Sequence, residues 1–350
     1  MTVDRTCIPL EAWPEADRAM WEALVRDAGP LDDPGPLRAL RETSRRTYRQ
    51  ASGTWLAWMA RAEPAALDLP PAERVNAERL VAWVTAHDAL SATSHATTVA
   101  GVLRLARAAA HDCDWCAEAR LESRLRLAAK RDHGARKKGR VLSSTVLFEA
   151  GLEMLGLAAE AASTPLLSAR LKRDGLMIAV LAALPIRRRA FVALRIAREL
   201  ILRRGAADVV LDETMTKSGD PWEAPLPQAL LGPMDCYVDE VRPWFLSRGG
   251  EAHDVLWVGD RGRPYHEVHM GQRITRLTEK TLGVRVPPHF FRDAAATTLA
   301  RELPQDARLM RPLLGQRSFG VAERHYNHAR GLEAASDYAD ILDDLGREET

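Results

Sequence analysis

The stretch PHFFRDAAATTLA, residues 288–300, is the segment from which the fold of this chain can be worked out. We expect a helix over 288–303, in which a spacing of three places His289 and Arg292 on one face at its start. A histidine and an arginine at an ordinary helix surface form a pair of little energetic consequence. The pair therefore gains meaning only from the other segments of the chain.

Length and composition indicate a globular protein of ordinary solubility. The chain has 350 residues, of which 46% are hydrophobic and 28% charged, so it can form two domains with their own cores. No run approaches the roughly 20 apolar residues of a membrane span. The N-terminal segment contains acidic residues and lacks the apolar core of a secretory signal. We therefore expect a cytoplasmic protein with no membrane partner.

The cysteines indicate neither a disulfide framework nor a metal centre. The chain has four of them, which fits a reducing compartment. Cys113 and Cys116 form a C-x-x-C, but no second pair of ligands lies at the spacing of a metal site. We expect no metal and no cofactor.

The charges are unevenly distributed, although the formal net charge is only +1. Segment 120–140 contains nine Lys or Arg residues and two acidic residues, and segment 185–204 contains seven Arg and one Glu. The last twenty residues instead contain seven acidic residues and one Arg. Two basic clusters of this density favour phosphate binding, which an average over the chain would hide.

The first half of the sequence has the periodicity of amphipathic helices, for example in RTYRQASGTWLAWMARA, residues 46–62. A polar, glycine-containing basic segment follows and predicts an extended linker. We therefore divide the chain into an N-terminal extension (1–37), a helical bundle (38–128), a basic linker (129–144), a second domain (145–330) and an acidic C-terminal helix or tail (331–350).

The second domain is predicted to be mostly helical as well. A helix is expected over 146–161, followed within 164–205 by two helices that are separated at Pro185. Strand signals appear only in ADVVLDETMTKSGDPWEAPLP, residues 207–227, which predicts a hairpin or a three-stranded sheet. The fold class is therefore mainly α with one small antiparallel sheet.

Four segments of the second domain contain residues that suit phosphate chemistry, and their order is informative. LPIRRRAFVALRI (184–196) contains arginines at a helix junction, and TMTKSGDP (214–221) places Lys217 at a hairpin turn. PHFFRDAAATTLA follows, and LLGQRSFGVAERHYNHA (313–329) contains Gln316 and, ten residues later, Tyr326. The order Arg, Lys, His-x-x-Arg, Leu-Gly-Gln, Tyr resembles that of the tyrosine recombinases, the phage-integrase-like site-specific recombinases.

The resemblance implies a helical core-binding domain, a mostly helical catalytic domain with one small sheet, and a reaction that needs neither metal nor ATP. It implies that Tyr326 attacks the scissile phosphate to give a 3′-phosphotyrosine. Arg187 and Arg292 would bind the phosphate oxygens, although Arg188 and Arg189 leave the register of the first arginine open. Lys217 would protonate the departing 5′-oxygen, and His289 would bind a phosphate oxygen or assist proton transfer from the phenol. Gln316 would donate a hydrogen bond to the phosphate.

The partners implied are double-stranded DNA and three further copies of the chain, and an accessory DNA-bending protein is a possible additional partner. The implied location is the nucleoid. The acidic C-terminal helix could dock on a neighbouring subunit or pack on its own domain. The basic linker is expected to cross the DNA backbone and to contact phosphates through Lys130, Arg131, Arg136, Lys137, Lys138 and Arg140.

Three departures from the family pattern bear on activity. Gln316 stands where the family usually has His, Asp293 replaces the second His of H-x-x-R-H, and Ala190 stands where an acidic residue often supports the first arginine. The carboxylate of Asp293 could orient Arg292, cap the helix or repel the phosphate. A catalytically impaired, integrase-like DNA-binding protein therefore remains the alternative. A metal-dependent nuclease is a weaker rival, because the acidic residues cluster only in the tail.

Overall fold

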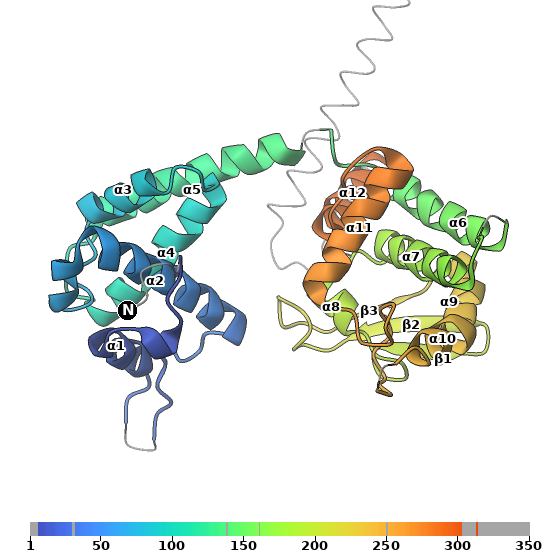
Figure 1. Ribbon diagram of the computed structural model, residues 1–350, viewed down its shortest axis with the longest axis horizontal. Coiled ribbons are helices and arrows are strands. Elements are labelled where there is room, and N and C mark those ends of the chain that lie inside the picture. The colour runs from blue at the N-terminus through green and yellow to red at the C-terminus, as the bar shows by residue number, and fades with distance from the viewer. Residues whose placement is uncertain are drawn as a thin grey trace, which may run out of the picture. The chain divides into compact units, whose positions relative to one another are not determined.

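The computed structural model describes residues 6–29, 32–137, 139–160, 162–249, 251–302 and 313. The chain divides into two compact units, Met1–Lys138 and Gly139–Thr350. Most of the described residues are helical, and three short strands form a single antiparallel sheet in the second unit (Figure 1). The predicted fold class, mainly α with one small antiparallel sheet, is confirmed. Within these ranges no helix has both the length and the apolar character that a membrane crossing requires.

The first unit is a helical bundle around a core rich in tryptophan. Trp55, Trp58 and Trp83 are buried together with aliphatic side chains from the neighbouring helices. Two of its helices begin at capping side chains, those of Asn76 and Ser91. Its elements are η1 (Leu10–Ala12), α1 (Glu15–Val25), α2 (Glu42–Ala62), η2 (Pro64–Asp68), α3 (Ala77–Ala86), α4 (Ala92–Ala109) and α5 (Cys116–Lys137).

Residues of the predicted N-terminal extension (1–37) pack into the core of this bundle. Trp13 and Trp21 are buried in the core of the first unit. The backbone N–H of Ile8 donates to the carbonyl of Gly53 over 3.0 Å, and a Cβ atom at Gly53 would lie 2.3 Å from the Ile8 carbonyl oxygen. Only glycine on α2 allows the N-terminal segment to approach so closely.

A buried ion pair joins two other segments of the first unit. The Arg74 guanidinium lies 2.6 Å from the Asp17 carboxylate, and both side chains are almost fully buried. Arg74 also donates to the backbone carbonyls of Leu67 and Leu69, so the charge has several partners. Helix α1 is thereby fixed to the turn that follows η2.

The second unit packs helices on one small sheet around its own core. Helices α6 and α7 cross so closely that a Cβ atom at Gly175 would lie 2.7 Å from the carbonyl oxygen of Gly151. The elements are α6 (Ser144–Glu160), α7 (Pro165–Ala183), α8 (Arg188–Ala193), β1 (Leu200–Arg203), β2 (Ala206–Leu211), β3 (Trp222–Pro225), η3 (Gln228–Leu230), α9 (Leu231–Cys236), η4 (Tyr237–Val241), α10 (Arg242–Leu246), α11 (Glu267–Leu282) and α12 (Pro288–Glu302).

The sheet has the order β1-β2-β3, with Leu200 paired to Val209 and Val209 paired to Ala224. Alternate residues of β2 are buried, which places one face of the sheet on the core. The prediction of a second helix running through the LILR segment is wrong, because these residues form β1. Gly205, with φ of +74°, allows the tight turn that pairs β1 with β2.

The basic linker also differs from the prediction of an extended segment over 129–144. Helix α5 continues to Lys137, so much of the segment is helical. Lys and Arg have high intrinsic helix propensity, and a single glycine inside a helix costs only about 1 kcal/mol. The second unit begins immediately afterwards, at Gly139.

Candidate active site

Arg187 and Arg292 line the same pocket, although they are more than a hundred residues apart in the sequence. Helix α7 ends at Ala183, and Arg187 is the N-cap residue of α8. Arg292 lies on α12, and its Nη1 atom donates to the carbonyl oxygen of Pro185 over 2.5 Å. This hydrogen bond fixes α12 to the chain that joins α7 and α8.

The two guanidiniums share an unfavourable electrostatic environment. Burial and the positive charge of Arg187 lower the pKa of Arg292 to about 10, against the opposing effect of Asp293. Burial also lowers the pKa of Arg187. With the described residues, the Arg187 guanidinium makes no hydrogen bond or ion pair. A negatively charged group bound in this pocket would offset both the repulsion and the desolvation of the arginines.

The segment between β2 and β3 forms another wall of the pocket. Met215 and Thr216 line it, and Lys217 follows directly in the chain with an exposed side chain. Trp222, at the start of β3, also lines the pocket, and its Nε1 atom donates to the carbonyl oxygen of Leu313 over 3.2 Å. The sheet therefore places Lys217 beside a pocket that contains two arginines.

The remaining predicted residues of the second unit lie on α12, in the lining of the pocket, or beyond the described ranges. His289 is exposed on the first turn of α12, and its ring lies edge-on to Phe290 with ring centroids 4.6 Å apart. Ala190 is buried and lines the pocket beside Arg187. Gln316 and Tyr326 lie outside the described residues, as does the acidic C-terminal segment.

Of the three neighbouring arginines, Arg187 is the one that lines the pocket. Arg188 lies 2.9 Å from the carboxylate of Glu267 on α11, and it packs against Gly271 of the same helix. Arg189 is exposed on α8. The geometry therefore favours Arg187 for a role at the pocket and Arg188 for the packing of α8 on α11.

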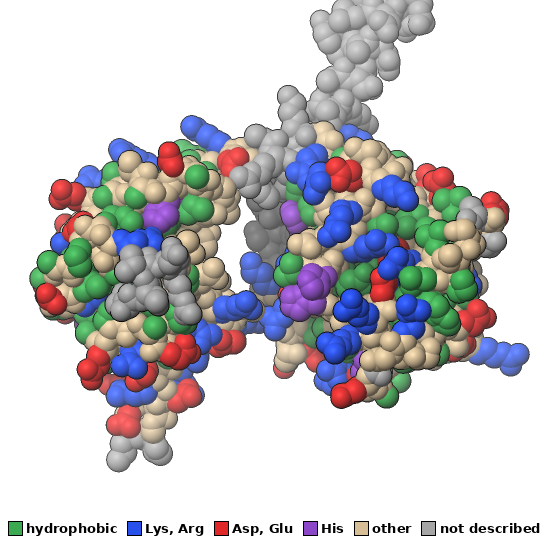
Figure 2. Space-filling model, viewed as in Figure 1, with side chains coloured by type: hydrophobic (Ala, Val, Ile, Leu, Met, Phe, Trp, Pro, Cys, Tyr) green, Lys and Arg blue, Asp and Glu red, His purple; other side chains and the backbone are tan. Residues whose placement is uncertain are grey.

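Basic side chains gather on the face of the second unit that carries α8, α11 and α12, as Figure 2 shows. Histidine side chains lie among them in that view. A basic surface of this kind attracts the phosphate backbone of a nucleic acid. The exposed cationic or histidine residues of these helices are Arg188, Arg189, His269, Arg276, Lys280, His289 and Arg301.

The residues predicted to contact DNA from the linker have different settings. Lys130 and Arg131 are exposed on α5. Arg136 and Lys137 lie in the last turn of that helix, and Lys138 lies outside the described residues. Arg140 instead makes contacts within the second unit. Its guanidinium donates to the carbonyl oxygen of Arg285 and lies over the ring of Phe290.

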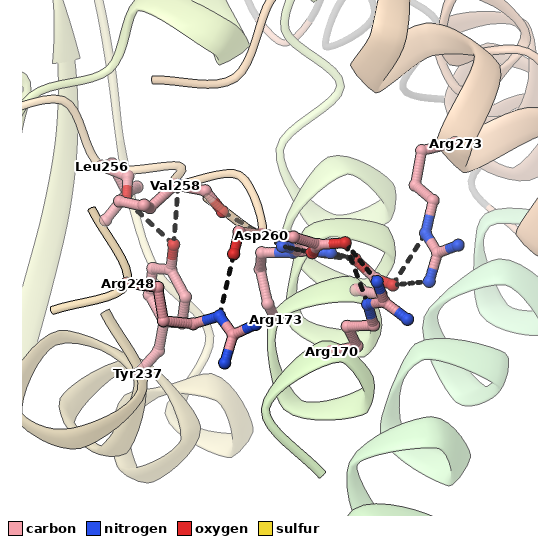
Figure 3. A network of polar contacts seen from close by, with 9 residues as sticks. Arg170, Arg173, Tyr237, Arg248, Leu256, Val258, Asp260 and Arg273 are labelled. Atoms are coloured by element: carbon pink, nitrogen blue, oxygen red, sulfur yellow. Dashed lines mark hydrogen bonds and ion pairs between the residues drawn. The ribbon is translucent and has the colours of Figure 1, made fainter. Parts of the chain in front are cut away.

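Sequence reasoning missed a polar network inside the second unit (Figure 3). Arg173 on α7 is fully buried and donates to the carboxylates of Asp174 and Asp260 and to the carbonyl of Val258. Arg273 from α11 also pairs with Asp174. The only signal in the sequence is the Arg-Asp pair directly before the apolar run GLMIAVLAA (175–183), and charged residues beside such a run are buried only when paired.

The network connects elements that are distant in the sequence. Asp260 also accepts from Arg170 over 2.6 Å, while Arg248 donates to the Asp260 carbonyl over 3.0 Å. The Tyr237 hydroxyl donates to the carbonyl of Leu256 and accepts from the N–H of Val258, as Figure 3 also shows. Helix α7 is thereby joined to α11 and to the chain that follows α10.

Among the described residues, no group of three or more His, Cys, Asp or Glu side chains is placed to hold a metal ion. No protein-family model matches the sequence, and no curated protein matches it significantly.

Solved structures do match the chain. It resembles the XerH site-specific recombinase bound to a palindromic difH substrate in a post-cleavage complex, at 14% identity and a TM-score of 0.56, over 95% of this chain and 99% of that one. It also resembles a lambda integrase dimer bound to a COC′ core site, at 17% identity and a TM-score of 0.50, over 84% of this chain and 74% of that one.

The chain has the tyrosine recombinase fold. The match spans nearly the full length of XerH, so it includes both units of this chain. Within the tyrosine recombinase fold, this chain places Arg187, Arg292 and the β2–β3 segment around one pocket.

Proposed function

We propose that this chain is a site-specific DNA recombinase that cuts and rejoins double-stranded DNA through a 3′-phosphotyrosine. The observation that carries the proposal is the pocket in which Arg187 and Arg292 lie together with a lowered pKa for each. Two desolvated guanidiniums suit a phosphodiester, whose oxygens accept bidentate hydrogen bonds from planar donors. The tyrosine recombinase fold and the exposed Lys217 beside the pocket support the same conclusion.

The proposed chemistry needs no metal, ATP or other cofactor. The phenol oxygen of Tyr326 attacks the scissile phosphorus, an O–P bond to tyrosine forms, and the bond from phosphorus to the 5′-oxygen breaks. Arg187 and Arg292 stabilise the negative charge on the phosphate oxygens that are not displaced. Lys217 gives a proton to the departing 5′-oxygen. The free 5′-hydroxyl of a second strand reverses the step, which rejoins the DNA.

Two further residues complete the proposed site. His289 binds a phosphate oxygen or assists the transfer of the phenolic proton. The side-chain amide of Gln316 donates a hydrogen bond to the phosphate, a role that needs a donor but no acid or base. Gln316→His should raise the rate of cleavage, and an unchanged or lower rate would remove this account of Gln316.

The proposed partners follow from the reaction. Strand exchange joins two DNA sites, each cut on two strands, so four copies of the chain assemble on DNA at the nucleoid. Exposed Lys130 and Arg131 on α5 contact phosphates in this arrangement. Binding should therefore weaken steeply as the salt concentration rises.

A second function is kept because one observation favours it. The negative charge of Asp293 acts on Arg292, and in that position it also repels a phosphate. An integrase-like protein that binds its site without cleaving it is the corresponding alternative.

The test of the proposal is the formation of covalent adducts. Supercoiled plasmid carrying the DNA that flanks this gene is incubated with the full-length protein in EDTA, and SDS-resistant protein–DNA adducts are measured. We expect adducts with the wild-type chain and with Tyr338→Phe, a matched control on the other C-terminal tyrosine, but none with Tyr326→Phe. Site-specific binding without adducts would support the alternative, and adducts that disappear in EDTA would contradict the metal-free mechanism.

A further inference from the structure

We propose that Arg140 is a positioning residue that holds the first turn of α12 in the orientation that the reaction needs. This inference rests on the proposed function, since α12 contains His289 and Arg292. The basic run around Arg140 indicates a phosphate contact at the sequence level. Its actual contacts in the second unit point to a different role.

The guanidinium of Arg140 holds the chain just before α12. Its Nε and Nη2 atoms both donate to the carbonyl oxygen of Arg285, over 3.1 and 2.7 Å. Arg285 lies in the short segment between the end of α11 and the start of α12. The two donors converge on one oxygen, so the contact restrains direction as well as distance.

The same guanidinium also contacts the first turn of the helix. Its Cζ atom lies 5.2 Å from the centroid of the Phe290 ring, within the range of a cation–π contact. The Phe290 ring is buried, and its centroid lies 4.6 Å from that of the His289 ring. Arg140 therefore reaches, through one aromatic ring, the histidine of the proposed site.

A second hydrogen bond joins the start of the second unit, residues 139–144 (the entry segment), to α12. The backbone N–H of Ser144 donates to the Thr298 hydroxyl over 2.8 Å. Val141 and Leu142, between the two ties, pack against the core of the second unit. The entry segment, residues 139–144, is thus attached to α12 at two points. It begins where the first unit ends, at Lys138.

The other end of the first turn is held by the site itself. Arg292 donates to the Pro185 carbonyl from α12, which fixes the helix relative to Arg187. Arg140 instead contacts the Arg285 carbonyl, which precedes this turn, and the Phe290 ring within it. Loss of the Arg140 contacts should leave the pocket in place but allow the first turn of α12 to shift. Displacements of about 1 Å at a reacting group can cost about a hundredfold in rate.

The choice of substitutions separates positioning from phosphate binding. Arg140→Lys keeps the positive charge but loses the fork of donors and most of the stacking on Phe290. A phosphate contact tolerates lysine, whereas the contact with Arg285 and Phe290 does not. Arg140→Met removes the charge and keeps an unbranched apolar chain. Lys130→Met, in the same basic run but on α5, is the matched control.

The first experiment measures binding and cleavage separately with the full-length chain. Affinity for the flanking-DNA site is measured over a range of salt concentrations, and the rate of adduct formation is measured at saturating DNA. We expect both Arg140 variants to lower that rate by at least about tenfold, with affinity and salt dependence unchanged. Lys130→Met should instead weaken binding and reduce the salt slope by about 0.9.

Two outcomes overturn the proposal: wild-type rates in both Arg140 variants, or a normal rate in Arg140→Lys with weaker binding in Arg140→Met. Hydrogen–deuterium exchange of the free protein provides a readout that does not depend on cleavage. Amides 289–293 should exchange faster in Arg140→Lys than in the wild type, while α7 is unchanged. Unchanged exchange there would refute positioning, whereas absence of adducts from the wild type would refute the proposed function alone.

Discussion

Replacing one arginine of the proposed site should stabilise the protein. Arg187→Met removes the positive charge that lowers the pKa of Arg292 and puts an apolar chain of similar length beside Ile186 and Leu211. For a base whose pKa is lowered by folding, the charged form destabilises the folded state. That penalty is fully present below the folded-state pKa of about 10 and is relieved as the pH rises further. At neutral pH the whole effect is therefore measurable.

The size of the effect follows from the pKa of Arg292. A fall from 12.5 to about 10 corresponds to about 3 kcal/mol, since each pKa unit is worth about 1.4 kcal/mol. Burial is the largest cause and persists in the variant, so we assign about 1 kcal/mol to the charge of Arg187. For a unit of roughly 200 residues this raises the melting temperature by about 2–4 °C. The same variant should lose DNA cleavage, because it lacks one of the two guanidiniums.

Thermal unfolding at pH 7.5 tests this prediction, with Arg188→Met as the matched control. Arg188 pairs with Glu267 at an exposed position, so its loss should leave the melting temperature unchanged or slightly lower. The gain from Arg187→Met should shrink as salt is added, since salt screens the repulsion. If Arg187→Met melts at or below the temperature of Arg188→Met, the electrostatic account of the pocket is wrong.

Three further predictions concern the second unit. Burial raises the pKa of Asp260, but hydrogen bonds from Arg170 and Arg173 outweigh burial and lower the pKa overall. The stability that this lowered pKa provides is present above about pH 3.9 and is lost on further acidification. Asp260→Asn should therefore flatten the dependence of stability on pH below about pH 4. Arg173→Met leaves Asp174 buried with one arginine fewer and should cost about 3 kcal/mol in urea unfolding, with part of the loss restored by adding Asp174→Asn. Trp222→Phe removes the donor to the Leu313 carbonyl and should slow adduct formation by about tenfold at unchanged affinity; a wild-type rate would show that this bond has no part in positioning.

The sequence predicted the fold class because its strongest signals are local. PHFFRDAAATTLA has the pattern of a helix start, and the structure has α12 beginning at Pro288. The turn residues after β2 separate two short strands, and both strands are present. Local patterns of this kind depend only on neighbouring residues, so a single sequence is enough to recognise them.

The errors arose where distant residues decide the structure. LILR is an apolar run whose periodicity does not distinguish a strand from a helix, and it becomes β1 because Leu200 pairs with Val209. The N-terminal tryptophans, such as Trp13, are buried only because Gly53 allows close approach to α2. Neither contact can be predicted from the residues that neighbour it in the sequence.

The site was predictable in its residue types and order but not in its geometry. Arg187 and Arg292 stood out through the motifs, whereas the Pro185 carbonyl that holds Arg292 is 107 residues away from it. Arg140 was assigned to DNA because of the charge around it, and its partner Arg285 lies 145 residues further along the chain. Contacts with backbone carbonyls cannot be inferred from residue identity, because every residue has one.

The measurement that tests the central claim most directly is the chemical identity of the protein–DNA link. A nicked substrate that traps the covalent intermediate is incubated with the full-length protein in EDTA, and the nucleotide-bearing peptide is identified by mass spectrometry. We predict a 3′-phosphate joined to Tyr326. A link to any other residue, a 5′-phosphate linkage, or specific binding with no covalent product would contradict the account.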